Sequence, residues 1–391
     1  MPKTHEGFLL IADITGYTQY LTESELEHAQ ETLTALLELL VENTRPPLVI
    51  SRLAGDAVIS YGLRDDFYQG QSFIEKIEDT YVVFRKAIER LVLNNTCRCN
   101  ACANIGNLDL KFFVHYGTFG IQRISDHDEL VGSDINLIHR LLKNSVSEAT
   151  GFRAYALYTD AALQQLGDDE LLQTLTPHTE EYEHLGQVQV RVQDMHPVWE
   201  RKRSTAEVAF PTDRLWARFE VQINIPRERV WDYLTQSQFR NILIGSDTID
   251  IVNRSQGRIA SGSVYHCYHG DKMVPHTILE WQPFERLLVR EVGPYFPDNP
   301  GLSEYVLEEK DGGTRLTKTS ARPTGPPFGR AMLRLMTPMF NRMMPGAFEK
   351  FRDEIEKDYR AHSEAAESGV EITADQIQEA AAVSLLASID D

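Results

Sequence analysis

Cysteine is scarce in this chain, with four in 391 residues, and three of the four lie close together. So few cysteines do not make a disulfide framework, and we expect a protein of the reducing cytoplasm. The sequence also lacks any run of about 18 apolar residues, so no transmembrane helix is expected. The first ten residues have neither a basic start nor a small-residue cleavage site, which argues against a signal peptide.

Basic residues are also few, because 39 Lys and Arg stand against 58 Asp and Glu, a formal charge of −19. An acidic surface repels phosphate backbones, so we expect no nucleic-acid partner, although a locally basic cleft still admits a small anionic substrate. The apolar fraction is 42% and the charged fraction 25%, as in ordinary globular chains. At roughly 100–200 residues per domain, the length predicts two or three domains.

The first half of the chain alternates apolar runs with segments of helical spacing. The continuous apolar run 7–12 predicts a strand buried on both faces. Ser24 and Glu27 form a capping-box pattern at the start of a helix that extends to Asn43. The other expected elements are a hairpin of strands 47–51 and 57–61, a helix 73–93, strands 108–115 and 117–124, a helix 136–142, and strands 154–158 and 188–192. This order predicts an α+β, ferredoxin-like domain with additions.

The second half has a different pattern. Pro197, the basic cluster 200–203 and Pro211 indicate a linker over 197–213, between a domain 1–196 and a domain 214–362. After the linker we expect a strand 216–225, a short helix 226–234, several strands punctuated by glycine, and a helix 328–360 broken at Pro338 and Pro345. Residues 363–391 carry seven acidic residues and no Lys or Arg, which predicts a disordered or weakly helical tail.

Two aspartates suggest a metal site in the first domain. Asp13 comes at the end of the predicted buried strand, and Asp56 at the tip of the predicted hairpin. In a ferredoxin-like sheet the first strand lies beside such a hairpin, so the two carboxylates could meet. Carboxylates together with a backbone carbonyl, such as that of Ile14, suit Mg²⁺ or Mn²⁺.

Four short motifs in a fixed order carry a specific resemblance. They are Ile11-Ala-Asp-Ile-Thr-Gly-Tyr-Thr18, Arg52-Leu-Ala-Gly-Asp56, Val114-His-Tyr-Gly117 and Gly132-Ser-Asp-Ile-Asn-Leu-Ile-His-Arg140. Together they resemble the class III nucleotidyl cyclases, the adenylyl and guanylyl cyclase family. One of them alone would be a weak signal, but four in order over about 150 residues make a specific match.

The resemblance implies roles for particular residues. Asp13 and Asp56 match the aspartates that bind two divalent metals, while Asn136 and Arg140 match the pair that orients the ribose and stabilises the transition state. Their spacing of four places Asn136 and Arg140 on one helix face. In the implied reaction the ribose 3′-hydroxyl attacks the α-phosphate of a nucleoside triphosphate and pyrophosphate leaves.

The base-selecting positions depart from the family, since adenylyl enzymes usually pair Lys with Asp or Thr and this chain has Arg52 and Glu129. A cationic donor and a carboxylate acceptor suit the ring nitrogen and the exocyclic amine of adenine, and also those of cytosine. ATP is therefore the favoured substrate. For the phosphate-binding lysine that the family carries late in the domain, we expect Arg153 or a neighbour.

The family builds its active site between two catalytic domains arranged head to tail. One copy per chain therefore implies a homodimer with two equivalent sites. The alternative is a catalytically degenerate domain that senses a nucleotide or only dimerises, in a protein that binds a lipid or another hydrophobe.

Cys97, Cys99 and Cys102 form a separate cluster between the second predicted helix and the third predicted strand. Three thiolates this close could bind Zn²⁺ or take part in redox chemistry, although a structural zinc site has four ligands. The simpler interpretation is a tight loop with small, partly buried thiols.

Residues 214–362 resemble the START-like superfamily, also called SRPBCC or polyketide cyclase-like. The motifs are Ile225-Pro-Arg-Glu-Arg-Val-Trp-Asp232, Gly262-Ser-Val-Tyr265, Thr277-Ile-Leu-Glu-Trp281 and Gly312-Gly-Thr-Arg-Leu316. The resemblance implies a helix-grip fold, in which an antiparallel sheet wraps around a long helix and often leaves an apolar cavity. The last predicted helix carries adaptable side chains that suit a variable ligand or plain core packing: Met332, Leu335, Met336, Met339, Phe340, Met343 and Met344. Such a module fused to a cyclase suggests a sensor.

Overall fold

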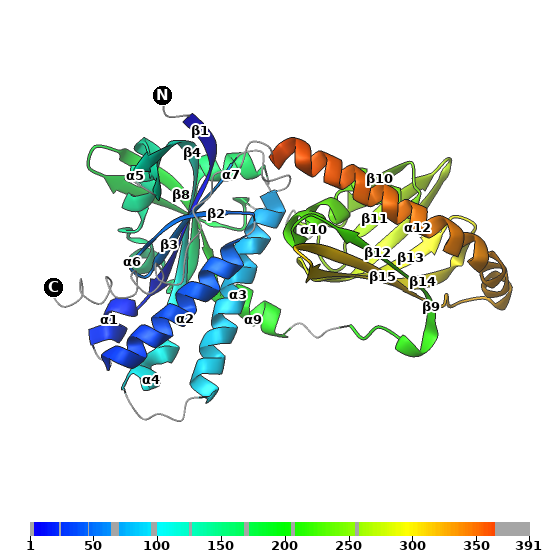
Figure 1. Cartoon of the computed structure of the whole chain (residues 1–391), viewed down its shortest axis with the longest axis horizontal. Coiled ribbons are helices and arrows are strands. Elements are labelled where there is room, and N and C mark those ends of the chain that lie inside the picture. Colours follow the sequence, from blue (N-terminus) through cyan, green and yellow to red (C-terminus); the bar gives the residue numbers. More distant parts are fainter. Residues whose placement is uncertain are drawn as a thin grey trace. The chain divides into compact units, whose positions relative to one another are not determined.

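The structure is a computed structural model that describes residues 4–22, 25–45, 47–63, 70–94, 100–124, 127–167, 172–204, 208–254 and 258–363 (Figure 1). The described chain divides into two compact units, an N-terminal unit that ends at residue 204 and a C-terminal unit that begins at residue 208. Both units combine helices with a sheet, which confirms the predicted α+β class. Within these residues, no helix has the length and apolar character needed to cross a membrane.

An eight-stranded sheet forms the centre of the N-terminal unit. Seven strands follow the order β2-β3-β1-β4-β6-β8-β7, and β5 pairs with β4. The central strand β1 is antiparallel to both β3 and β4, whereas β4 and β6 are parallel. The strands are β1 (Thr4–Thr15), β2 (Val49–Ala54), β3 (Ala57–Leu63), β4 (Asp109–Ile124), β5 (His127–Val131), β6 (Tyr155–Thr159), β7 (Thr176–Tyr182) and β8 (Gly186–Asp194).

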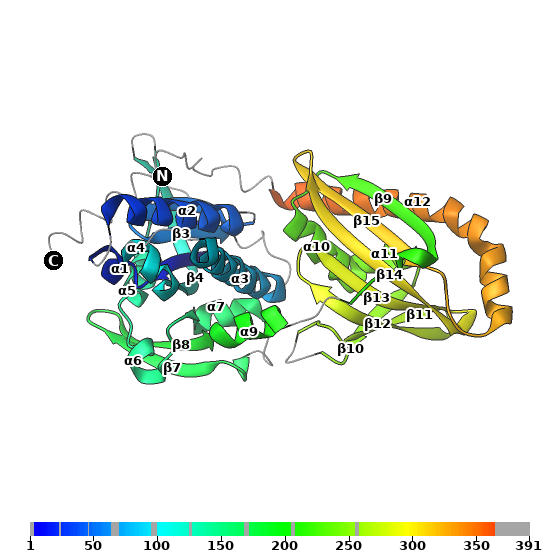
Figure 2. The same ribbon diagram turned by 90° about the horizontal axis from the view of Figure 1, so that it is seen from below.

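Helices cover both faces of this sheet (Figure 2). Leu10 and Ala12 of β1 face the core beneath α2 and α3, while Leu9 and Ile11 face a second core that includes Ile135 of α5. This split follows from the alternation of side chains along a strand. The helices are α1 (Tyr17–Thr22), α2 (Leu26–Thr44), α3 (Gly70–Asn94), α4 (Asn100–Asn104), the 3₁₀ turn η2 (Ile105–Asn107), α5 (Ser133–Leu141), α6 (Val146–Thr150), α7 (Asp160–Leu166) and α9 (His196–Ser204).

The order β1-α2-β2-β3-α3-β4 is the ferredoxin-like order that the sequence predicts. The predicted break between strands 108–115 and 117–124 is wrong, because β4 runs on and Gly117 pairs with Gly7 of β1. Strands β5 and β7 were not predicted. The N-cap of α2 is Glu25 without a side-chain cap, and Ser24 of the predicted capping box lies outside the described residues.

The predicted linker 197–213 begins too early. Residues 196–204 form α9, whose Val198 and Trp199 are buried in the core of the N-terminal unit. The basic cluster 200–203 therefore lies on the exposed part of a docked helix. Most of the predicted acidic tail, residues 364–391, lies outside the described residues.

The C-terminal unit is an antiparallel sheet with one long helix against it. Its seven strands follow the order β10-β11-β12-β13-β14-β15-β9. The elements are η3 (Thr212–Arg214), β9 (Leu215–Ile223), α10 (Arg227–Thr235), α11 (Ser237–Ile244), β10 (Thr248–Val252), β11 (Val264–His269), β12 (Lys272–Gln282), β13 (Arg286–Gly293), β14 (Phe296–Lys310), β15 (Gly313–Ala321) and α12 (Pro327–Ser363).

The long helix α12 differs from its prediction in one respect. It is continuous through Pro338 and Pro345, where the sequence predicts breaks. Figure 2 shows it bending instead, the usual result of proline inside a helix. Its C-terminal half buries Phe348, Phe351 and Ile355, and this burial holds the helix on the sheet.

Candidate functional site

Asp13 and Asp56 come together at one end of β1. Asp13 pairs with Ala57 across β1 and β3, and the Ile14 N–H donates a hydrogen bond of 3.2 Å to the Asp56 carbonyl. Burial raises the pKa of Asp13 to about 6, against the influence of Lys111. Burial and then the charge of Asp13 raise the pKa of Asp56 to about 7, against a backbone hydrogen bond. The two half-buried carboxylates therefore lie close enough to disfavour each other's charge.

This pair fits a divalent cation. A bound cation would favour the charged form of both carboxylates and so offset their burial. Among the described residues no group of three or more His, Cys, Asp and Glu side chains is placed to hold a metal. A cation at Asp13 and Asp56 would therefore complete its shell with other oxygens, such as the Ile14 carbonyl, water or a bound phosphate, as Mg²⁺ commonly does.

Lys111 of β4 is a neighbour of this pair that our sequence analysis missed. It stands directly opposite Asp13 in the register of β1 and β4, and its Nζ lies 5.0 Å from the centre of the Tyr155 ring. Burial lowers the pKa of Lys111, while Asp13 and Asp109 act in the opposite direction. The available signal was a single lysine inside the apolar run 110–114, which a buried strand rarely accepts without a charge partner.

Arg52 and Glu129 form an ion pair. Arg52 Nη1 of β2 lies 3.0 Å from Glu129 Oε2 of β5, although 77 residues separate them in the chain. Arg52 Nη2 lies 3.2 Å from His139 Nε2 of α5. Burial and then the charge of Arg52 lower the pKa of His139, so the ring is neutral and its Nε2 accepts from the guanidinium. The structure thus joins the two predicted base-selecting residues and adds His139, which lies in the fourth motif but was given no role in the sequence analysis.

Helix α5 starts with a tight approach to β4. Asp134 accepts a hydrogen bond of 2.7 Å from the Thr118 N–H, and its other oxygen lies 3.5 Å from His115 Nε2. A Cβ at Gly117 would come within 2.4 Å of the Asp134 carboxylate, so any larger residue there would displace the Asp134 side chain. The third and fourth of the quoted motifs therefore meet at this point, with Gly132 as the N-cap of α5 at a φ of 146°.

Asn136 and Arg140 lie on the exposed side of α5. The opposite side of the helix is buried, through Ile135, Ile138 and Leu141. Within the described residues, no hydrogen bond or ion pair joins the side chains of Asn136 and Arg140 to the Asp13–Asp56 pair. In the described chain the two predicted halves of the site are thus not joined by a hydrogen bond or an ion pair, and Asn136 and Arg140 are exposed.

The remaining predicted site residues are Arg153 and the three clustered cysteines. Arg153 is exposed, and its Nη2 donates a hydrogen bond of 3.2 Å to the Asn107 carbonyl. A Cβ at Gly16, whose φ is 86°, would lie 3.2 Å from that same carbonyl, so Arg153 is near the turn after Asp13. Cys102 Sγ lies 3.9 Å from His28 Nδ1 of α2. Cys97 and Cys99 lie outside the described residues, so the cluster stays a prediction.

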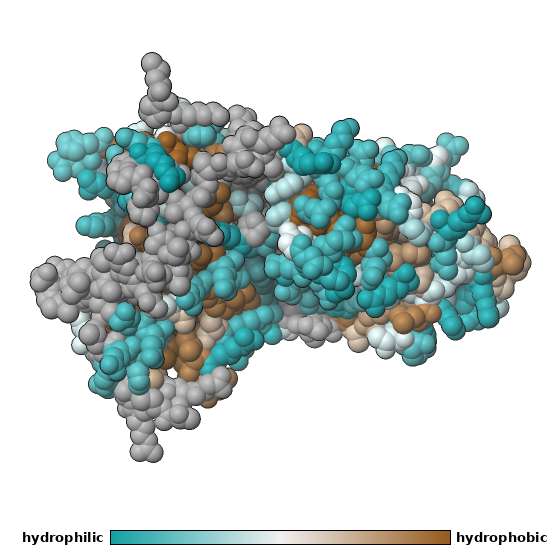
Figure 3. Space-filling view, viewed as in Figure 1, coloured by the Kyte–Doolittle hydropathy of each residue, from teal (hydrophilic) through white to brown (hydrophobic). Residues whose placement is uncertain are grey.

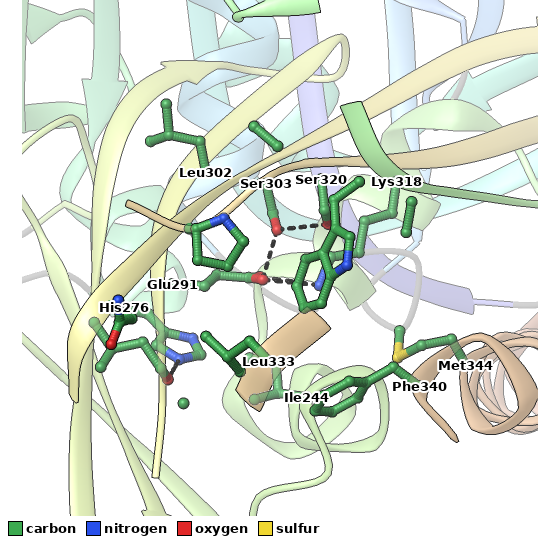
Figure 4. Close-up of a pocket in the computed structure, with 18 of the residues that line it drawn as sticks. Ile244, His276, Glu291, Leu302, Ser303, Lys318, Ser320, Leu333, Phe340 and Met344 are labelled. Carbon is green, nitrogen blue, oxygen red and sulfur yellow. Dashed lines mark hydrogen bonds and ion pairs between the residues drawn. The ribbon is translucent and has the colours of Figure 1, made fainter. Parts of the chain in front are cut away.

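The C-terminal unit holds a cavity of about 210 Å³ (Figure 4). Leu333, Phe340 and Met344 of α12 line one side of it, and β13, β14 and β15 line the other. Of the seven adaptable side chains that suit a variable ligand or plain core packing, Phe340 and Met344 line the cavity. Leu335, Met339 and Met343 are exposed instead.

Comparison with known proteins gives partial matches. Residues 33–150 match a family described as "Protein of unknown function (DUF2652)". The chain is 32% identical over 112 residues to the uncharacterized protein Rv2561/Rv2562 of Mycobacterium tuberculosis, covering 29% of this chain and 50% of that protein. The chain thus spans about half the length of this curated relative.

Two solved structures are similar in part. One is a bacterial light-regulated adenylyl cyclase, at 14% identity and a TM-score of 0.37, covering 53% of this chain and 59% of that one. Another is the adenylyl cyclase CyaB from P. aeruginosa, at 15% identity and a TM-score of 0.36, covering 50% of this chain and 96% of that one.

Proposed function

We propose that the N-terminal unit is a metal-dependent nucleotidyl cyclase, which converts a nucleoside triphosphate, ATP in preference, into a 3′,5′-cyclic nucleotide and pyrophosphate. The observation that carries the proposal is the pairing of Asp13 with Asp56. These two half-buried carboxylates come from distant parts of the chain, and the charge of Asp13 disfavours that of Asp56. Such a pair is suited to a cation and to a substrate that brings one.

Each group of the site has a role in this reaction. Asp13, Asp56 and the Ile14 carbonyl would hold two Mg²⁺ or Mn²⁺ ions, which would make the ribose 3′-hydroxyl more acidic and neutralise the triphosphate. Lys111, opposite Asp13, and Arg153 would contact phosphate oxygens. Asn136 would orient the ribose, and Arg140 would stabilise the charge that develops at the α-phosphate while pyrophosphate leaves.

The Arg52–Glu129 pair supports the preference for adenine. The guanidinium only donates and the carboxylate only accepts, which matches a ring nitrogen beside an exocyclic amine. Neutral His139 accepts from Arg52 and would hold the guanidinium in place when the base enters. A guanine site would need an acceptor where Arg52 stands.

A homodimer would complete the site. No hydrogen bond or ion pair joins the Asp13–Asp56 pair to the exposed Asn136 and Arg140 in the described chain. Two chains arranged head to tail would bring the aspartates of one to the Asn136–Arg140 half of the other, and would form two equivalent sites.

The test is turnover of ATP, GTP, CTP and UTP with Mn²⁺, with cyclic products resolved by mass. We expect a cyclic product from ATP that is lost in Asp56→Asn and kept in Asp271→Asn, an aspartate of an exposed turn in the other unit. Absence of product from every nucleotide, in a protein shown to be dimeric, would contradict the proposal. Nucleotide binding without turnover would then favour a nucleotide-sensing protein.

We also propose that the C-terminal unit, whose sequence motifs resemble the START-like superfamily, binds an apolar ligand and regulates the cyclase. The cavity of about 210 Å³ between its sheet and α12 supports this. Ligand binding would change the dimer equilibrium or geometry and so the rate. Measurable binding of apolar ligands without any change in cyclase rate would contradict the regulatory role.

A further inference from the structure

A cluster of polar side chains lies at the wall of the C-terminal cavity, made of Glu291, Ser303, Tyr305, Lys318 and Ser320 (Figure 4). Glu291 accepts from Lys318 Nζ at 2.9 and 3.2 Å, from Ser303 Oγ at 2.6 Å and from Tyr305 OH at 2.7 Å. A carboxylate has about four lone-pair sites, so the acceptor capacity of Glu291 is full.

Unlike Glu291, the hydroxyl oxygen of Ser320 can still accept a hydrogen bond. Ser303 has one hydroxyl hydrogen and donates it to Glu291. In the 3.0 Å contact between the two serines, Ser320 must therefore be the donor. Ser320 Oγ accepts nothing from the described residues, and the residue lines the cavity. A ligand meets an acceptor at this point.

The donors of the cluster and the ring N–H of His276 are already used. Lys318 donates to both oxygens of Glu291 and interacts with the Tyr305 hydroxyl. His276 must donate from Nε2 to the Val292 carbonyl at 2.9 Å, which leaves its Nδ1 as the acceptor that faces Cys267 Sγ at 3.6 Å. Arg240 is fully buried and does not line the cavity, and its Cζ lies 4.5 and 5.0 Å from the centres of the Tyr265 and Tyr305 rings. Its Nε and Nη2 have no hydrogen-bond partner among the described residues.

We propose that this cavity binds a neutral, apolar molecule that carries one hydroxyl, which donates its hydrogen to Ser320 Oγ. An anionic head group would find no free donor in the cluster, and burying it would cost free energy. An engineered cavity of about 150 Å³ holds benzene, so this one takes roughly eight to ten non-hydrogen atoms or the end of a longer chain. The inference deepens the proposed ligand-binding role and does not depend on cyclase activity.

The test uses four probes of equal chain length on the full-length protein: octanol, octyl methyl ether, octylamine and octanoate. Calorimetry or displacement of a fluorescent apolar dye gives their affinities. We expect octanol to bind about tenfold more tightly than the ether, which accepts but cannot donate. Octanoate and octylamine should bind more weakly still, because a buried charge would be unpaired.

Ser320→Ala should reduce the advantage of octanol over the ether to about twofold or less. Thr319→Ala, the next residue on the same strand, serves as the matched control and should leave it unchanged. Leu333→Phe, which fills the cavity, should abolish binding of all probes, and its melting temperature shows whether it folds. Tighter binding of octanoate, equal binding of octanol and ether, or no probe binding at all would each overturn the inference.

A second feature, the exposed face of α12, is independent of the cavity. No Asp or Glu occurs between Asp311 and Glu349, whereas six Lys and Arg do, in a chain of net charge −19. Leu335, Met339 and Met343 are 73%, 48% and 62% exposed, and Phe328 is 74% exposed. Figure 3 shows apolar side chains in brown at the end of the C-terminal unit where the first turns of α12 lie.

Three arginines flank these apolar side chains on the helix. Arg330, Arg334 and Arg342 are exposed and form no ion pair with any described residue. Arg352, further along α12, pairs with Asp353 instead. We infer that the segment 328–343 is a docking surface for a membrane with anionic lipids, because exposed apolar groups bordered by unpaired arginines match such a surface in hydropathy and charge.

Sedimentation with vesicles of phosphatidylcholine, with and without one-third phosphatidylserine, tests this surface. We expect binding to the anionic vesicles that falls with salt and that drops at least about tenfold when Arg330, Arg334 and Arg342 are all changed to Gln. Arg352→Gln is the matched control on the same helix. If the triple variant binds the anionic vesicles as tightly as the parent does, the membrane proposal is wrong. If the triple variant keeps its vesicle binding but no longer forms a dimer, the face serves a second copy of the chain instead.

Discussion

Buried carboxylates occur in both units, and the two groups are built in opposite ways. Burial raises the pKa of Asp13 and Asp56, and the one cation beside them in the described chain, Lys111, does not reverse the effect. Burial acts in the same direction on Glu291, but the charge of Lys318 and the hydrogen bond from Ser303 outweigh it and hold the pKa of Glu291 well below its usual range.

The difference indicates that the Glu291 cluster is balanced by its own chain, whereas the Asp13–Asp56 pair needs an external cation. Glu291 has four hydrogen bonds from its own chain, and it serves to hold the cavity wall. The aspartate pair has a surplus of negative charge that an external cation would balance.

The largest expected effect is on the reaction. Asp56→Asn keeps the size of the side chain but removes a metal-binding charge, so cyclase turnover should fall at least about a hundredfold. The melting temperature without metal should stay the same or rise, because a buried repulsion is relieved. Retention of full turnover in this variant would exclude the proposed metal role.

Next comes the stability of the C-terminal unit. Lys318→Met leaves Glu291 buried without its cation and should reduce the free energy of unfolding by about 3–5 kcal/mol, as measured by chemical denaturation. The double change Lys318→Met with Glu291→Leu removes both charges and should recover most of the loss. If the Lys318→Met variant is as stable as the parent, the ion pair between Lys318 and Glu291 does not stabilise the folded protein as described.

The stability of the protein should also depend on pH through the Asp13–Asp56 pair. Carboxyls whose folded-state pKa is raised contribute stability below the unfolded pKa and lose it as the pH rises through the folded pKa. In metal-free buffer, Asp13 and Asp56 should therefore lower stability from about pH 4 to about pH 7. Melting temperatures across this range should fall for the parent relative to Asp13→Asn with Asp56→Asn, and Mn²⁺ should remove the difference.

The smallest effect concerns the exposed ion pair. Arg52 and Glu129 are partly solvated, with side chains 44% and 33% exposed, so Arg52→Ala should change unfolding free energy by less than about 1 kcal/mol. It should nevertheless reduce the preference for ATP over GTP about tenfold, because a base-recognising donor is lost. Arg52→Lys, the conservative control, should keep the preference in large part.

The sequence predicts the elements that have strong local patterns. The apolar run 7–12, the helical spacing of α2 and the Gly-Asp turn at Asp56 each predict an element that the structure contains. The sequence does not predict elements whose formation depends on tertiary contacts. β5 is short and polar, and α9 resembles a linker until Trp199 is seen to be buried.

The candidate site was predictable where motifs carry the information. Asp13, Asp56, Arg52 and Glu129 were all identified from the chain, and the structure brings each pair together. Lys111 and His139 were missed because their significance depends on register: Lys111 lies opposite Asp13 across two strands, and His139 meets Arg52 only when α5 packs on the sheet.

The most direct test of this contrast is a carbon-13 NMR titration of the aspartate side chains, with and without Mg²⁺. Without metal, two aspartates should titrate with pKa values of about 6 and about 7, and both should shift far downward when Mg²⁺ is added. Asp56→Asn should remove one of the two signals. Ordinary aspartate titrations that Mg²⁺ does not alter would contradict the account of the aspartate pair as a cation site.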